Sequence, residues 1–157
     1  MAEKGWDLNA ELKRVAALLE RKGLRYAVCG GMAVSLYSEP RATVDLDLVI
    51  DPADLEKVMV ALKEIGFESF SAPMNFKGGE MIIHRVLKLE PEKSQVLMLD
   101  LCMPDKSKFP RVWKDWKKID LGDYSLTTLS REGLIEMKRS RGSEKDLLDI
   151  RNLEETE

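Results

Sequence analysis

The sequence predicts an α/β protein in which helices flank a mixed β-sheet, formed by a single domain over residues 1–157. Segments with apolar residues at helical spacing alternate with short apolar runs over the first hundred residues, which is typical of a sheet covered by helices. The 157 residues are 44% hydrophobic, enough to bury one core without disulfides or a structural metal. We expect the core at about residues 24–128 and a helical pair at about 130–154.

The elements of the first half are marked by caps and glycines. Asp7 or Asn9 can cap a first helix, whose apolar positions recur up to Gly23. A proline after Asp51 is typical of a helix start, and Gly66 ends that helix. Between these two helices the sequence predicts a strand, a short apolar helix and a second strand, at residues 25–29, 32–37 and 44–50.

The second half is predicted as strands followed by helices. Residues 67–70 form a candidate strand, and residues 81–89 and 96–103 read as two strands joined by a polar turn. We expect residues 104–118 to include a short helix. Ser130 can cap a helix that ends near Arg141, and Ser143 with Asp146 forms a capping box for the last helix.

Composition excludes several classes of protein. The 25 basic and 28 acidic residues give a net charge of −3, which argues against a wholly basic nucleic-acid coat protein. The single histidine, His84, excludes multi-histidine metal sites, and Cys29 and Cys102 each lie in an apolar run as small buried hydrophobes. No apolar run approaches the roughly 20 residues of a membrane span, so we expect a cytoplasmic protein without a membrane partner.

Two aspartates on one strand are the first candidate site residues. Side chains alternate along a strand, so Asp45 and Asp47 would project from the same face, while the neighbouring leucines face a core. Adjacent carboxylates repel, and the repulsion requires a cation or solvent to offset it. A solvated edge strand is the alternative interpretation.

A third aspartate lies in the apolar run of residues 96–103. A lone carboxylate in a strand buried on both faces is costly unless it is paired or binds metal. If this strand lies beside the first, Asp100 joins Asp45 and Asp47 in a three-carboxylate cluster suited to Mg²⁺ or Mn²⁺. A single buried aspartate with a structural partner remains the alternative.

The pair Gly30-Gly31 lies where the first strand leads into a helix. Glycines at such a junction let backbone N–H groups approach a ligand, and a helix N-terminus favours phosphate. A purely structural glycine turn is the alternative. Neither the dinucleotide fingerprint nor the P-loop motif is present.

Together these motifs resemble the nucleotidyltransferase superfamily typified by DNA polymerase beta. Its glycine motif is matched by residues 28–31, its paired acids by residues 45–48 and its third acid by residues 99–101. Arg41 and Thr43 resemble an R-x-T motif of the small branch that includes AbiEii-type toxin proteins. A C-terminal segment of that branch is matched around Lys138 and at Lys145-Asp146, although Glu144 departs from its usual arginine. The resemblance covers about residues 24–154.

The resemblance implies transfer of a nucleoside monophosphate from a nucleoside triphosphate to an acceptor hydroxyl. Asp45 and Asp47 would hold two Mg²⁺ or Mn²⁺ ions, and Asp100 would orient the ion that activates the acceptor and serve as general base. The residues implied to carry the triphosphate are Gly30 and Gly31, with Arg41, Thr43 and Lys138 as further phosphate candidates. Arg41 could equally pair with an acid, and Lys138 could be a solvated helix residue.

The acceptor has three candidate classes. The first is a hydroxyl on a protein or RNA in a toxin–antitoxin or phage-defence setting, with a cognate toxin or antitoxin as partner. The second hypothesis is a non-catalytic nucleotide-binding or partner-binding module that resembles an antitoxin. The third is an antibiotic-modifying transferase, for which the short C-terminal part leaves little room within one subunit. Because the catalytic core fills nearly all of the 157 residues, we expect acceptor recognition to come from a second copy in a homodimer or from a separate protein.

Two further groups of residues have open interpretations. The basic and aromatic residues 106–118 could stack single-stranded nucleic acid on Trp113 or Trp116, but packing of Phe109 and Trp113 with solvated lysines is favoured. Lys145 with Asp146 and Asp149 is expected to form a structural network between the last two helices.

Overall fold

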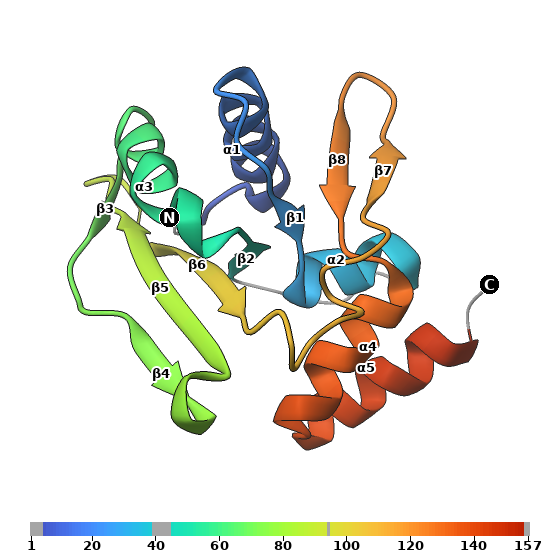
Figure 1. Cartoon of the computed structure of the whole chain (residues 1–157). Helices are drawn as coiled ribbons and strands as arrows, with labels where there is room; N and C mark the ends of the chain where they lie inside the picture. Colours follow the sequence, from blue (N-terminus) through green and yellow to red (C-terminus); the bar gives the residue numbers. More distant parts are fainter. Residues whose placement is uncertain (1–4, 39–44, 94, 156–157) are drawn as a thin grey trace.

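The computed structural model of the chain describes residues 5–38, 45–93 and 95–155 and confirms the expected mixed sheet flanked by helices (Figure 1). Five helices and eight strands are present in the described residues. In chain order they are α1 (Leu8–Arg21), β1 (Ala27–Val28), α2 (Gly30–Tyr37), β2 (Leu46–Val49), α3 (Leu55–Lys63), β3 (Phe67–Ser69), β4 (Met74–Phe76), β5 (Met81–Lys88), β6 (Leu97–Pro104), β7 (Lys117–Asp120), β8 (Ser125–Thr128), α4 (Arg131–Arg141) and α5 (Glu144–Glu155).

The strands form one sheet in the order β3-β5-β6-β2-β1-β8-β7, with β4 paired to β5 outside this path. Strands β2 and β6 are parallel neighbours at the centre, whereas β5 runs antiparallel to β6. The expected adjacency of the two aspartate-bearing strands is therefore confirmed.

One face of the sheet carries the main core. Leu46 and Leu48 of β2 are fully buried, and so are Leu99 and Leu101, their partners in register on β6. Helices α1 and α3 contact one another and carry buried apolar residues into the same core. Because register neighbours project to the same side, Asp47 and Asp100 lie on the opposite face.

Helix α2 contacts β2, α4 and α5 on the side of the aspartates. In Figure 1, α4 and α5 lie side by side below α2. The side chain of Ser130 caps α4, as predicted, and Gly142 ends it in the left-handed conformation. The predicted capping box of α5 is also present, since Ser143 Oγ donates to Asp146 Oδ2 at 2.7 Å and accepts from its backbone N–H.

The structure differs from the expectation in three places. Helix α2 begins at Gly30, two residues earlier than predicted, although Gly30 itself has a positive φ. Strands β4, β7 and β8 are not predicted by the sequence pattern, since they are three or four residues long and lack a strong apolar alternation. Residues 105–116 form turns instead of the expected short helix.

Both cysteines are buried free thiols, as expected from their apolar surroundings. In the described part of the chain, no helix combines the length and apolar character needed to cross a membrane.

Candidate active site

The centre of the site is the pairing of β2 with β6. Asp47 lies directly beside Asp100 in the parallel register, and Asp45 immediately precedes β2. The three aspartates therefore lie on adjacent segments that are more than fifty residues apart in the sequence. Asp100 is 8% exposed, whereas Asp45 and Asp47 are half-buried.

Gly30 packs directly against one of these carboxylates. A Cβ atom at residue 30 would lie 2.2 Å from Oδ2 of Asp47, closer than any real contact. The backbone of Gly30 also has a φ of +66°, which L-residues with side chains rarely adopt. Glycine is thus required at this position by both the local conformation and the neighbouring aspartate.

The N-terminus of α2 directs its first backbone N–H groups toward the region beside Asp47. Its N-cap residue, Cys29, makes no side-chain capping hydrogen bond, and the first turn contains no acidic residue. The first N–H groups of a helix have no intrahelical partner and attract anions. Gly30 and Gly31 therefore provide the type of backbone cradle that phosphate binding needs.

The neighbouring carboxylates repel one another and disfavour the ionised form of Asp47. Burial, followed by the charges of Asp100 and Asp45, raises the pKa of Asp47 to about 7. The positive charges of Arg141 and Lys138 on α4 oppose this shift without cancelling it. A bound cation would therefore stabilise the ionised form of Asp47.

Asp100 already has a cationic partner. Arg85 of β5 lies opposite Asp100 in the antiparallel register and donates from Nε to Oδ1 at 2.8 Å and from Nη2 to Oδ2 at 3.1 Å. The hydrogen bond with Asp100 also raises the pKa of Arg85, so the guanidinium stays charged. Asp100 therefore has a structural partner, Arg85, which was the alternative interpretation, and it also lies beside Asp47.

The carboxylates do not form a ready-made ligand cage. Among the described residues, no group of three or more histidine, cysteine, aspartate or glutamate side chains is arranged to hold a metal ion. The carboxylate oxygens of Asp45 and Asp47 are nevertheless ligands of the kind that a divalent cation prefers, and such an ion would stabilise the anion of Asp47, whose pKa is raised.

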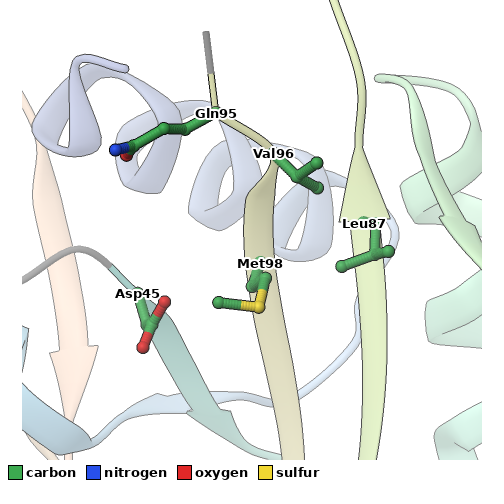
Figure 2. Close-up of a pocket in the computed structure, with 5 residues that line it drawn as sticks. All are labelled: Asp45, Leu87, Gln95, Val96 and Met98. Atoms are coloured by element: carbon green, nitrogen blue, oxygen red, sulfur yellow. The ribbon is translucent and has the colours of Figure 1, made fainter. Parts of the chain in front are cut away.

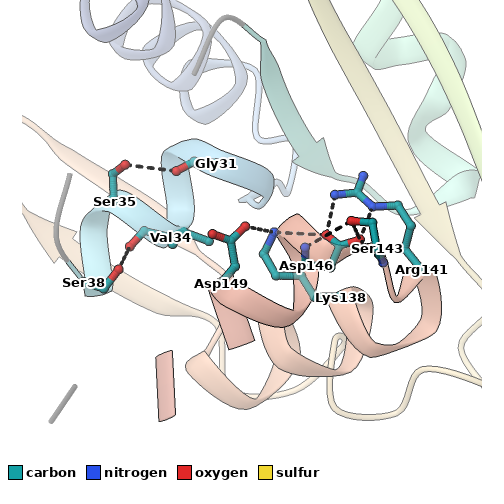
Figure 3. A network of polar contacts seen from close by, with 9 residues as sticks. All are labelled: Gly31, Val34, Ser35, Ser38, Lys138, Arg141, Ser143, Asp146 and Asp149. Carbon is teal, nitrogen blue, oxygen red and sulfur yellow. Dashed lines mark hydrogen bonds and ion pairs between the residues drawn. The ribbon is translucent and has the colours of Figure 1, made fainter. Parts of the chain in front are cut away.

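Lys138 lies in a buried network between α4 and α5 (Figure 3). Its ammonium group is 2.9 Å from Asp149 Oδ2 and 3.7 Å from Asp146 Oδ1, and its side chain is only 5% exposed. The alternative of a solvated helix residue is therefore wrong. The expected network of Asp146 and Asp149 is present, but its cations are Lys138 and Arg141, whereas Lys145 is exposed.

Sequence reasoning overlooked two arginines. Arg141 binds both oxygens of Asp146, at 2.7 and 2.6 Å, and its charge acts on Asp47. Arg85 lies in β5, where nothing in the sequence pattern distinguishes it from a solvated strand residue. Only the register of β5 with β6 shows that it faces Asp100. Of the predicted phosphate ligands, Arg41 and Thr43 lie outside the described residues.

The basic segment is packed through its aromatic residues. Phe109 is buried, and Nε1 of Trp113 donates to the backbone of Pro104 at 3.0 Å. The ring of Trp116 is covered by Arg25, with 4.7 Å between the guanidinium carbon and the ring centre. These contacts favour the packing interpretation. All lysines of the segment are exposed: Lys106, Lys108, Lys114, Lys117 and Lys118.

An open apolar cavity lies beside Asp45, on the face that carries the carboxylates (Figure 2). Its volume is about 430 Å³, within the range of small-molecule sites. Besides Asp45, its lining comes from β5, β6 and the residues before β6: Leu87, Gln95, Val96 and Met98.

Solved structures with the same architecture include nucleotidyltransferases. The aminoglycoside-modifying ANT(2″)-Ia, in complex with adenylyl-2″-tobramycin, aligns with a TM-score of 0.65 and 12% identity over 94% of this chain and 88% of that one. The lincosamide adenylyltransferase LnuA, bound to lincomycin, aligns with a TM-score of 0.59 and 16% identity over 93% and 96%. An antigenic nucleotidyltransferase-like protein from Paracoccidioides brasiliensis has 23% identity and a TM-score of 0.59 over 94% and 73%.

This chain therefore has the nucleotidyltransferase fold, as the motif resemblance implied. No protein-family model matches the sequence, and no curated protein matches it.

Proposed function

We propose that this protein transfers a nucleoside monophosphate from a nucleoside triphosphate to an acceptor hydroxyl, with release of pyrophosphate. The observation that carries the proposal is the close approach of Gly30 to Asp47, with Asp100 beside it in register. Within the nucleotidyltransferase fold, a helix N-terminus that can bind phosphate is thus in contact with a carboxylate that can bind a cation.

In this proposal Asp45 and Asp47 hold Mg²⁺ or Mn²⁺, and Gly30 and Gly31 bind the triphosphate through their N–H groups. A bound divalent cation supplies neutralisation of the phosphate charge. Asp100 lies on the far side of Asp47 from Gly30, and there it would accept the proton of the acceptor hydroxyl. Arg41 and Thr43, just before Asp45, remain proposed phosphate ligands.

The test is transfer of label from α-³²P-labelled nucleoside triphosphates to components of a cell extract in the presence of Mg²⁺. Asp45→Asn and Asp47→Asn should each reduce labelling at least 100-fold. Asp123→Asn is the matched control, because Asp123 is exposed and pairs only with Lys13 among the described contacts. Equal labelling by the wild type and both site variants would contradict the proposal.

The same experiment separates the non-catalytic alternative. A binding module would bind nucleoside triphosphate in calorimetry but release no pyrophosphate with any acceptor. The exposed lysines of residues 106–118 offer positive charge to a protein or RNA acceptor. An AbiEii-like role in a toxin–antitoxin or phage-defence setting predicts that a protein or RNA from the host extract becomes labelled.

A small-molecule acceptor is the second candidate, and the apolar cavity beside Asp45 favours it. LnuA, which is bound to lincomycin, is covered over 96% of its length by this chain, so chain length is no argument against a small acceptor. Leu87→Lys in the cavity should then abolish transfer to hydroxylated small molecules. Val60→Lys, at a 66% exposed position on α3, is the control. Unchanged transfer by Leu87→Lys would exclude the cavity as the acceptor site.

A further inference from the structure

We infer that Arg85 supplies the positive charge that a second metal ion would otherwise bring to Asp100, so that the site binds one divalent ion and not two. The inference rests on the proposed function. It differs from the sequence expectation of two ions, and it assigns a positioning role to a residue on the neighbouring strand.

The first argument is geometric. Arg85 and Asp100 face each other across the β5–β6 ladder, and both carboxylate oxygens accept hydrogen bonds from the guanidinium. Bidentate pairs of this kind are among the strongest hydrogen-bonded ion pairs in proteins. Strand β5 also pairs with β3 and β4 on its other side, which keeps the backbone of Arg85 in place.

The second argument concerns charge. Asp100 carries one negative charge when ionised, and Arg85 balances it without a metal ion. Among the described residues, Lys138 and Arg141 also act on Asp47, but Lys138 pairs with Asp149 and Arg141 with Asp146. A second divalent ion at Asp100 would have to bind beside a guanidinium that already neutralises this carboxylate, and the two cations would repel each other.

The experiment counts bound Mn²⁺ on the full-length chain by electron paramagnetic resonance of the free ion, without nucleotide. We expect one saturable Mn²⁺ for the wild type and two for Arg85→Met, in which Asp100 is no longer neutralised. Arg85→Met/Asp100→Asn should return to one ion, which would locate the second ion at Asp100. Arg139→Met is the matched control and should bind one, because it removes another arginine–carboxylate pair, with Glu154, away from the site.

Circular dichroism establishes that each variant is folded, and Arg85→Gln replaces Arg85→Met if the latter is not. Two ions on the wild type, or one ion on both the wild type and the neutral Arg85 variant, would overturn the inference. Absence of Mn²⁺ binding by the wild type would overturn it as well. The labelling assay with Asp45→Asn and Asp47→Asn reports on the transferase proposal separately, so failure of one can be distinguished from failure of the other.

Discussion

Gly30 and Asp47 are in such close contact that a Cβ atom at residue 30 would lie 2.2 Å from a carboxylate oxygen. The backbone N–H of Cys29, one residue earlier, donates to the carbonyl of Asp47 at 3.0 Å. The start of α2 and the aspartate of β2 therefore form one rigid unit. Any displacement of Asp47 changes the surroundings of the helix N-terminus that we propose for phosphate binding.

The first prediction concerns Gly30→Ala. The added methyl group should displace Asp47 and weaken binding of Mg²⁺–nucleoside triphosphate at least tenfold in calorimetry. The left-handed backbone adds a strain of about 1–2 kcal/mol. Gly78→Ala is the matched control, because Gly78 has the same φ of +66° and a Cβ atom added there would meet nothing within 4 Å. Equal effects of the two substitutions on nucleotide binding would show that the contact with Asp47 is unimportant.

The second prediction concerns pH and Asp47 in metal-free protein. The pKa of Asp47 is raised to about 7 in the folded state, so between about pH 4 and 7 the folded protein binds more protons than the unfolded chain. This carboxyl group therefore destabilises the fold increasingly as pH rises through that window. Asp47→Asn should gain about 1–3 kcal/mol relative to wild type between pH 5 and pH 8, since the half-buried group is partly screened.

Urea unfolding in the presence of a chelator measures this gain. Asp123→Asn should show no comparable change between the two pH values, because the pKa of Asp123 is lowered by its hydrogen bond with Lys13. A stability difference between Asp47→Asn and wild type that is the same at pH 5 and pH 8 would refute the prediction.

The third prediction concerns the buried ion pair of Lys88 with Glu11 on the core face. The ammonium lies 3.2 Å from Oε2 of Glu11, and both side chains are less than 10% exposed. Lys88→Met should cost about 3 kcal/mol, because it leaves a buried carboxylate with less compensation. Glu11→Leu/Lys88→Met should recover most of that loss in urea unfolding. Lys22→Met, which breaks an exposed pair with Glu64, should cost less than about 1 kcal/mol.

The fourth prediction separates structural and phosphate-binding roles of Lys138. Its pairing with buried Asp149 predicts that Lys138→Met lowers the free energy of unfolding by about 3 kcal/mol. Affinity for nucleoside triphosphate should change less than threefold under conditions where the variant is folded. Loss of nucleotide binding without loss of stability would instead identify Lys138 as a phosphate ligand. Arg139→Met, on the exposed face of α4, provides the control for both measurements.

Local patterns were enough to predict much of this molecule. The alternation around Asp47 and the apolar run around Asp100 placed these residues on the expected strands, Asp45 directly precedes its strand, and the two glycines open α2. The expected fold class and the adjacency of the two aspartate strands are confirmed, because strand alternation and burial leave few arrangements. The short strands β4, β7 and β8 escaped prediction, since they carry little apolar pattern of their own.

By itself, therefore, the sequence determined the fold class, the strands on which Asp47 and Asp100 lie, and the glycine turn that leads into the short apolar helix. Only the tertiary structure decided that Arg85 neutralises Asp100, that Lys138 is buried between α4 and α5, and that Gly30 touches Asp47. These relationships join residues on different elements, and each depends on the register of a strand pair or the packing of two helices. A pattern along one segment carries no information about such a register, whereas the free energy of the folded chain depends on it directly.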